Sequence, residues 1–149
     1  MRPGRVARVM GVVVDAQFAV GDLPSISSAL LLRRPGREAL VLEVQEHVDP
    51  QTVRCIAMSS TSGLSRGMKV LDTGQPIQVP VGEATLGRMF NILGQPIDGG
   101  PPVDHAERRP IHLASPPLTR QRLPGEILET GLKVIDLLTP YGLGSKIGL

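Results

Sequence analysis

The sequence predicts a mainly β fold, in which a closed six-stranded β-barrel is followed by the opening segment of an α/β domain. The first eighty or so residues contain about six short runs rich in Val, Leu and Ile, separated by turn residues every eight to twelve positions. A proline-rich stretch comes next, and one amphipathic helical pattern stands near the end. A barrel is favoured over an open sheet because closure removes unpaired strand edges.

The composition is that of a globular protein with few aromatic side chains. The 149 residues are 41% hydrophobic and 20% charged, enough for one domain or for one small domain and part of a second. Only 2% are aromatic, which argues against binding of single-stranded nucleic acid, where bases stack on aromatic rings. The net charge of +2 comes from scattered arginines rather than from a stripe that follows phosphates. We therefore expect no nucleic-acid partner.

The number of cysteines and the lengths of the apolar runs indicate in which cellular compartment the protein is expected. Cys55 is the single cysteine, so no internal disulfide can form and a reducing compartment fits best. Its place in an alternating apolar stretch predicts a buried, inert thiol. The basic start Met1–Arg5 is not followed by the apolar run of a secretory signal. No segment approaches the roughly 20 apolar residues of a membrane helix, so we expect no direct membrane insertion.

The first strands are predicted from β-branched runs and turn residues. Val6–Asp15 is apolar almost throughout, which predicts one strand buried on nearly both faces, with a bulge or a close backbone approach at Gly11. Ala29–Arg34 is a second short strand. Pro35–Arg37 is a turn, because Pro presets one φ and Gly permits a positive one. Glu38–Val48 is the third strand.

Alternation predicts the inward face of the two central strands. In Glu38–Val48 one face is apolar and the other polar; the apolar residues are Leu40, Leu42 and Val44, and the polar ones Glu43, Gln45 and His47. In the following strand, Thr52–Met58, the residues of inward parity are Val53, Cys55 and Ala57. A loop rich in Ser and Gly, Ser59–Gly67, comes after it.

Two further strands are predicted to close the barrel, Met68–Leu71 and Ile77–Val81. Pro76 and Pro80 confine the second of these to an edge or rim, because proline cannot donate to a ladder of hydrogen bonds. We accordingly place the end of the barrel domain at residue 81, and residues 82–149 form a second segment.

Residues 94–125, called the connector below, hold seven of the 14 prolines of the chain. Such a stretch is predicted to form no regular element and to act as an extended connector. Apolar residues spread along it indicate that it lies on a folded surface; they are Ile97, Val103, Ile111 and Leu113.

The end of the chain is predicted to be a helix, a turn and a strand. Apolar residues stand at helical spacing on one face; they are Leu128, Leu132, Ile135 and Leu138. Glu129 and Lys133 form an i,i+4 pair on the other face. Pro140 and Gly142 end the helix. Lys146–Leu149 opens a strand of the kind that leads into a phosphate-binding glycine-rich loop, which we expect to follow Leu149.

Several candidate motifs carry no chemistry. The glycines Gly142, Gly144 and Gly148 precede a strand instead of following one and have the wrong spacing for a dinucleotide fingerprint. No regular spacing joins the possible metal ligands, which are Asp104, His105, Glu107 and His112.

The remaining candidates are also structural. Ser59–Ser62 lacks a basic partner at useful spacing and is predicted to be a loop. The arginines of the connector are predicted to be surface or subunit contacts; they are Arg108, Arg109, Arg120 and Arg122. We therefore predict no catalytic, cofactor-binding or metal-binding residue in this chain.

Three segments resemble a known family. Pro80–Asp98 resembles the passage that opens the nucleotide-binding domain in β subunits of F-type ATP synthases. Glu129–Tyr141 is similar to the stretch just before their phosphate loop, and Gly4–Phe18 with Leu40–Met58 looks like their amino-terminal barrel. The resemblance spans nearly the whole chain.

The resemblance implies a barrel at residues 1–81 that is one of six in the crown of an alternating α3β3 ring. It also implies that residues 82–149 are the truncated start of a nucleotide-binding domain. It implies α and β subunits as partners, a central stalk, and Mg-ATP or ADP and phosphate as ligands of the parent protein. The parent enzyme would make or hydrolyse ATP coupled to ion transport, as a peripheral protein at the cytoplasmic face of a bacterial inner membrane. The catalytic residues of the family match positions after Leu149, so this chain alone is expected to be an inactive structural or assembly module that binds no nucleotide.

Other readings stay open at this point. Non-catalytic α subunits and flagellar or type III export ATPases share the architecture, and Lys133–Leu138 favours β among them. Ser145 stands where a glycine is commoner, and residues 99–125 drift from the usual pattern, as in alternate bacterial forms that use sodium. A stand-alone nucleic-acid-binding barrel is disfavoured by the aromatic deficit.

Overall fold

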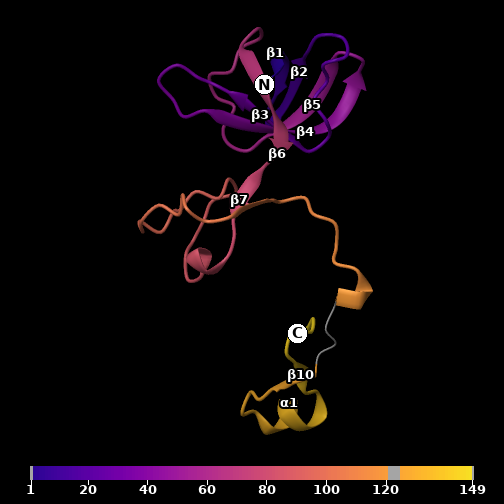
Figure 1. The fold of residues 1–149 in the computed structure, drawn as a ribbon, viewed down its shortest axis with the longest axis vertical. Coiled ribbons are helices and arrows are strands. Elements are labelled where there is room, and N and C mark those ends of the chain that lie inside the picture. The colour runs from indigo at the N-terminus through magenta and orange to yellow at the C-terminus, as the bar shows by residue number, and fades with distance from the viewer. Residues whose placement is uncertain (1, 121–124, 149) are drawn as a thin grey trace. The chain divides into compact units, whose positions relative to one another are not determined.

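The computed structural model describes residues 2–120 and 125–148, which form two compact units, Met1–Leu113 and Ala114–Leu149 (Figure 1). The first unit holds the barrel and the segment that leaves it, and the second holds the short helix. The domain division into residues 1–81 and 82–149 stays a prediction.

Six antiparallel strands close into a barrel, as the sequence predicts. They are β1 (Arg2–Met10), β2 (Val13–Gln17), β3 (Ser28–Leu32), β4 (Leu40–Asp49), β5 (Thr52–Ala57) and β6 (Lys69–Pro76). Their order around the barrel is β1-β2-β5-β4-β3-β6, and β6 returns to pair with β1 (Figure 1). Closure leaves no strand edge free for pairing with another chain.

The prediction of one strand over Val6–Asp15 was wrong. Met10 pairs with Val13, so Gly11 and Val12 form the two-residue loop of a hairpin between β1 and β2. Gly11 has a φ of 63°, which glycine adopts at little cost and which such hairpin turns require. The register shift expected there lies instead between Val6 and Arg8.

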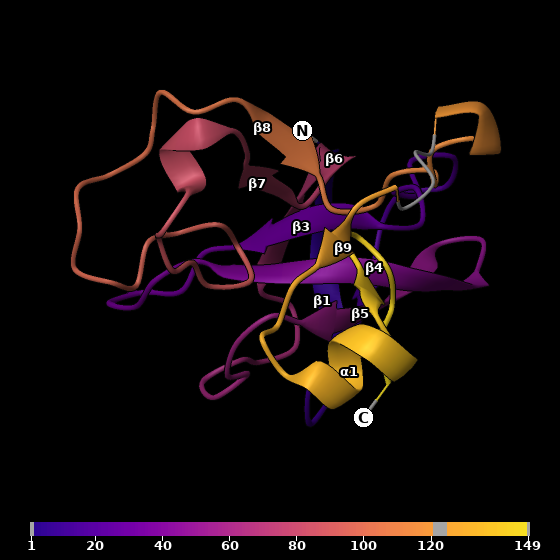
Figure 2. The same ribbon diagram turned by 90° about the horizontal axis from the view of Figure 1, so that it is seen from below.

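The last predicted barrel strand, Ile77–Val81, lies outside the barrel. β6 extends to Pro76, and the next strand, β7 (Gln78–Pro80), pairs with β8 (Arg108–Pro110), as Figure 2 shows. The prediction that the connector forms no regular element was therefore wrong at β8. The expected number of barrel strands was right because this error offset the missed hairpin.

The barrel interior is a single apolar cluster. Its buried members are Val6, Val14, Ala16, Phe18, Leu30, Leu32, Leu40, Leu42, Val44, Val53, Cys55, Ala57 and Val70. The inward parity predicted for β4 and β5 is confirmed. Each fully buried Leu or Val contributes about 1.5–3 kcal/mol relative to an exposed one, so the cluster is the main source of barrel stability.

One residue of the predicted polar face is buried. Glu43 is only 7% exposed, and Nε2 of His112 in the connector lies 3.2 Å from its Oε2. Gln45 donates a hydrogen bond from Nε2 to the other carboxylate oxygen at 2.6 Å. His47 is exposed as expected, and its Nε2 lies 2.7 Å from the carbonyl oxygen of Pro24.

Between β7 and β8 the chain is folded by polar contacts. After a short 3-10 helix (Glu83–Thr85), Arg88 forms an ion pair with Asp98, Nε to Oδ2 at 2.5 Å. The same carboxylate accepts hydrogen bonds from the backbone N–H groups of Met89 and Gly100. The hydrogen bond from Arg88 is the main reason that the pKa of Asp98 lies far below its ordinary value.

The second unit contains a 3-10 helix (Leu118–Arg120), β9 (Ile127–Leu128), α1 (Lys133–Leu138) and β10 (Tyr141–Gly142). The predicted helix is shorter than expected. Leu128 lies in β9 and pairs with Tyr141 of β10, so Glu129 precedes the helix and cannot form the predicted i,i+4 pair with Lys133. Gly131 has a φ of 78°, which a right-handed helix does not permit.

The loop before α1 is held by one carboxylate. Asp136 accepts hydrogen bonds from the N–H and the hydroxyl of Thr130 and from the N–H of Gly131. These bonds, first among them that of the Thr130 side chain, lower the pKa of Asp136.

The predicted strand at the end of the chain is absent over Lys146–Gly148, and Leu149 lies outside the described residues. A strand needs a pairing partner, and no described strand is paired with this segment. Within the described part of the chain, no helix has the length and apolar character needed to cross a bilayer.

Candidate interaction surface of the barrel

The possible metal ligands of the connector are not brought together. Within residues 2–120 and 125–148, no group of three or more His, Cys, Asp or Glu side chains is placed to hold a metal ion. Glu107 pairs with Arg109 at 2.9 Å, and His112 turns to Glu43 of the barrel. Asp104 and His105 are exposed.

The serine-rich loop is held by arginines through its backbone. Arg34 donates to the carbonyl oxygen of Ser60 at 2.8 Å, and Arg37 donates to that of Ser62 at 3.0 Å. The hydroxyl of Ser60 donates to that of Ser62, and neither contacts a general base in the described structure. These contacts hold the backbone of the loop, and the absence of a nucleophile site there stays a prediction.

The described arginines of the connector differ in their contacts. Arg108 donates to the carbonyl oxygens of Gln78 and Leu93, so it holds the chain segment around β7. Arg109 pairs with Glu107, and Arg120 is exposed at the end of a 3-10 helix. Arg122 lies outside the described residues.

The glycine pattern near the end has no nucleotide-binding geometry. Gly142 belongs to β10, and Gly144, with a φ of 79°, follows in the turn. The turn follows the two-residue strand β10, so the prediction that these glycines precede a strand was wrong. Among residues 125–148 no helix follows the turn, as it would after a phosphate-binding loop.

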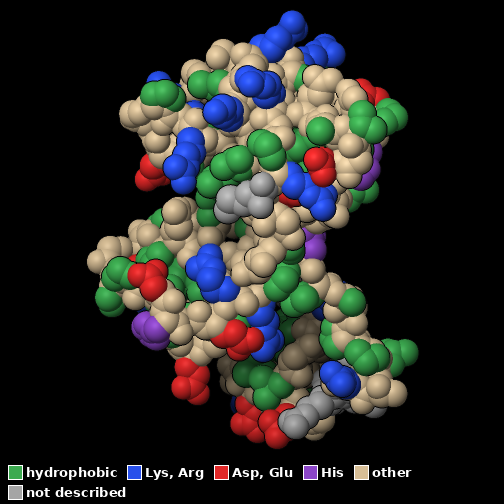
Figure 3. Space-filling view, turned by 45° about the horizontal axis from the view of Figure 1, so that its top comes forward, with side chains coloured by type: hydrophobic (Ala, Val, Ile, Leu, Met, Phe, Trp, Pro, Cys, Tyr) green, Lys and Arg blue, Asp and Glu red, His purple; other side chains and the backbone are tan. Residues whose placement is uncertain are grey.

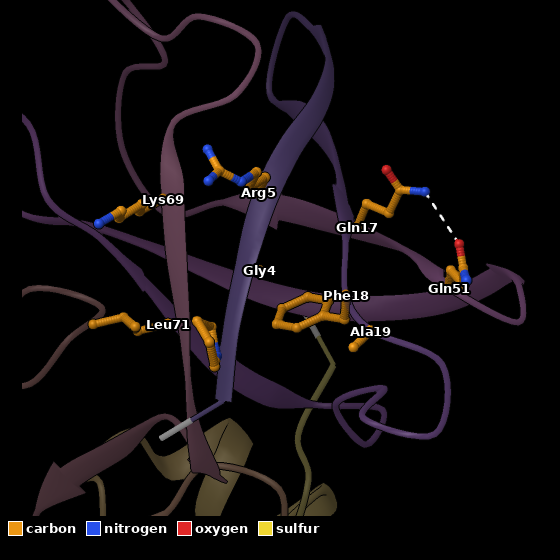
Figure 4. A pocket seen from close by; sticks show the side chains of 9 residues that line it. Gly4, Arg5, Gln17, Phe18, Ala19, Gln51, Lys69 and Leu71 are labelled. Carbon is orange, nitrogen blue, oxygen red and sulfur yellow. Dashed lines mark hydrogen bonds between the residues drawn. The ribbon is translucent and has the colours of Figure 1, made fainter.

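A hollow of about 520 Å³ lies on the barrel, over the first residues of β1 (Figure 4). The residues that line it are Pro3, Gly4, Arg5, Gln17, Phe18, Ala19, Gln51, Lys69 and Leu71. The apolar part of its wall comes from Phe18, Leu71 and Pro3, and none of the lining residues is acidic.

Gly4 and Phe18 shape this hollow. Phe18 is 4% exposed, and its backbone N–H donates to the carbonyl oxygen of Gln51 at 2.8 Å. A Cβ at Gly4 would lie 2.6 Å from the ring of Phe18 and 2.8 Å from the carbonyl oxygen of Gln17. Only a residue without a side chain therefore lets the ring close against β1. The amides of Gln17 and Gln51 contact each other at 3.3 Å beside the ring (Figure 4).

Cations line the wall above this ring. Arg5 of β1 and Lys69 of β6 are direct partners across the ladder, and both are exposed. A smaller hollow of about 320 Å³ adjoins at Arg5 and Gln17 and adds Arg66. Arg5 donates to the carbonyl oxygen of Gly67, and Arg66 to that of Ala7, which fixes both guanidinium groups over β1.

Three carboxylates of the barrel are buried, whereas Asp22, Glu38, Glu46 and Asp49 are exposed. Asp15 is 6% exposed and accepts two hydrogen bonds from Arg54, with Nε to Oδ1 at 3.0 Å; this bond raises the pKa of Arg54. Asp72 is 4% exposed and accepts from the N–H of Gly74. With Glu43 also buried, the barrel surface is more cationic than the net charge of the chain indicates. In Figure 3, Lys and Arg side chains gather over the barrel, with fewer acidic ones between them.

The single thiol takes no part in a site. Cys55 is fully buried, and burial, followed by the charge of Asp15, raises its pKa to about 12. Such a thiol is neutral and inert at physiological pH, as predicted.

Sequence reasoning missed the surface around Phe18. The residues come from β1, β2, β6 and two loops, and only closure of the barrel places them side by side. A usable signal was Gly4, a glycine inside an apolar run, which often marks close approach of another group.

Comparison with protein families gives one match. Residues 6–74 match the model described as ATP synthase alpha/beta family, beta-barrel domain. The matched range begins in β1 and ends in β6, so it covers the barrel.

Proposed function

We propose that this barrel, whose residues 6–74 match the β-barrel domain of the ATP synthase alpha/beta family, is the crown barrel of a β-type subunit in a rotary ATP synthase. The match over the barrel is the observation that carries the proposal. The family model covers α and β subunits alike, and the choice of β rests on the resemblance of Lys133–Leu138 to the helix of β subunits.

In this role the barrel holds neighbouring α and β subunits in an alternating ring. Closure suits it to this task, because a barrel without free edges cannot add strands from its neighbours and must contact them through side chains. The parent protein would make or hydrolyse ATP coupled to ion transport, and its place would be at the cytoplasmic face of a bacterial inner membrane.

Mg-ATP is the ligand that this proposal implies for the parent protein. The 149 residues contain no GxxxxGK[ST] segment, and the described residues offer no group of three or more metal-ligating side chains. The residues of this chain do not fit the nucleotide, and no catalytic step is assigned to them. Isothermal titration of the chain with Mg-ATP is expected to give no binding heat, and micromolar binding would contradict this expectation.

The assembly role is tested by co-expression with a bacterial F-type α subunit. A β-type barrel is expected to co-elute with the α subunit in size-exclusion chromatography and to compete with intact β subunit for ring assembly. The matched experiment replaces the α subunit by a β subunit. Co-elution with β alone would favour an α-type barrel, and co-elution with neither would refute the ring assignment.

A further inference from the structure

We propose that the surface formed by Arg5, Arg66, Lys69, Gln17 and Phe18, called the β1 surface below, docks an acidic segment of a partner protein. The proposal goes beyond the ring assignment, because it assigns the chemistry of a partner to one face of the barrel and rests on that face alone.

Unbalanced charge is the first observation. Arg5 and Lys69 are direct partners across the β1–β6 ladder, where two like charges on one face destabilise the sheet. Among the described residues, neither these two nor Arg66 has a carboxylate within 4.0 Å. A bound carboxylate would remove the repulsion and would gain a charge-assisted hydrogen bond.

The make-up of the two adjoining hollows is the second observation. Every charged residue that lines either hollow is a cation, and the polar residues between them are the amides of Gln17 and Gln51. Amides and guanidinium groups both donate to carboxylate oxygens. Leu71, which is half-buried in the lining, offers a place for an apolar side chain beside the acidic ones.

The spacing of the cations favours an acidic protein segment over other anions as the ligand. Arg66 is bound at Ala7 and Lys69 stands opposite Arg5, so the charges follow β1 over two residues, about 7 Å, rather than meeting at one point. A single small anion would reach only part of this row. Phe18 is buried and is the one aromatic residue in the lining, so bases of a nucleic acid would find no exposed ring to stack on.

The test uses the full 149-residue chain and a synthetic peptide of sequence Glu-Leu-Glu-Leu-Glu. Amide shifts in a ¹H–¹⁵N correlation spectrum are followed during titration at low salt and again at 0.3 M sodium chloride. Shifts are expected at Arg5, Gln17, Phe18 and Lys69, and affinity is expected to fall with salt. Shifts confined to other residues would overturn the proposal.

Two matched double variants test the cations. Arg5→Gln with Lys69→Gln is expected to weaken peptide binding by about tenfold or more, because two charge-assisted contacts are lost. Arg33→Gln with Arg37→Gln removes the same charge from the β3–β4 turn and is expected to change affinity by less than about threefold. Equal loss in both variants would show non-specific attraction and overturn the proposal. If the double variant at Arg5 and Lys69 does not fold, peptide affinity is measured with the single variant Arg5→Gln instead.

Two further titrations distinguish binding of an acidic peptide from binding of a small anion or of an uncharged peptide. Inorganic phosphate and a Gln-Leu-Gln-Leu-Gln peptide are expected to give much smaller shifts at the β1 surface than the acidic peptide does. Phosphate shifts as large as those of the acidic peptide would identify a small-anion site, and equal binding of the glutamine peptide would show that charge is irrelevant. Either result overturns the proposal.

Discussion

Substitution of Gly4 by alanine tests whether the contact between β1 and Phe18 holds this end of the barrel together. The added Cβ would lie 2.6 Å from Cε1 of Phe18 and 2.8 Å from the carbonyl oxygen of Gln17. The ring is only 4% exposed, and the backbone N–H of Phe18 is tied to Gln51, so the ring has little room to retreat. Such overpacking costs about 1–3 kcal/mol.

Urea unfolding followed by far-ultraviolet circular dichroism measures this cost. With a slope of about 2 kcal/mol per molar urea, the midpoint for Gly4→Ala is expected to fall by about 0.5–1.5 M. Gly125→Ala is the matched control, since a Cβ there meets no atom within 4 Å and Gly125 has no positive φ. This control is expected to unfold within about 0.5 kcal/mol of the parent chain.

A second substitution assigns the cost to the ring. Phe18→Leu removes the ring edge that Gly4→Ala would strike, so the alanine is expected to cost less in the Phe18→Leu background, with a coupling free energy of at least about 0.5 kcal/mol. If Gly4→Ala matches the Gly125→Ala control, or if its cost is unchanged in the Phe18→Leu background, the packing argument is refuted.

Three other predictions concern the core, the connector and the thiol. Leu42→Ala removes a fully buried side chain from β4 and is expected to cost about 2–5 kcal/mol in urea unfolding. His112→Gln removes the imidazole that contacts the buried carboxylate of Glu43, and amide exchange in the connector is expected to quicken by hydrogen-exchange mass spectrometry, whereas His105→Gln changes nothing. Cys55 is expected to react with a disulfide reagent at pH 8 only as the chain unfolds, because its pKa is raised to about 12.

The sign of the pH dependence of Cys55 follows from the same shift. The ordinary pKa is 9.0 and the folded value about 12, so between these values the unfolded thiol loses its proton before the folded one does. Stability is therefore expected to be fully present below pH 9 and to fall as the pH rises towards 12. A stability profile for Cys55→Ala as steep as that of the parent chain would assign the loss to other groups.

The predictions for Leu42, His112 and Cys55 each have a control or an outcome that would contradict them. Val12 is 59% exposed at the hairpin tip, and Val12→Ala is expected to cost less than about 0.5 kcal/mol, in contrast to Leu42→Ala. Exchange in the connector that is equal for His112→Gln and the parent chain would mean that Glu43 does not fasten this segment. Labelling of the folded thiol at the rate of a free peptide would contradict its burial.

Helix and hairpin boundaries show where local pattern failed. Val6–Asp15 is one apolar run, and its turn is marked only by Gly11, so periodicity does not separate the two strands. Leu128 fits helical spacing but pairs with Tyr141, because Gly131 interrupts the helix and the two strands then satisfy each other's backbone groups.

Alternation in the sequence was enough to determine the inward residues of β4 and β5, because side chains of a strand point to opposite faces and the apolar set must leave water. It identified Leu42 of β4 and Cys55 of β5 as inward residues and the mainly β class. Tertiary structure alone decided which segment forms the sixth strand of the barrel. It also decided that Glu43 is buried beside His112 and that Arg5, Lys69 and Phe18 gather on one surface. These features join residues far apart in the chain, and their energies depend on the closed barrel rather than on any local run of sequence.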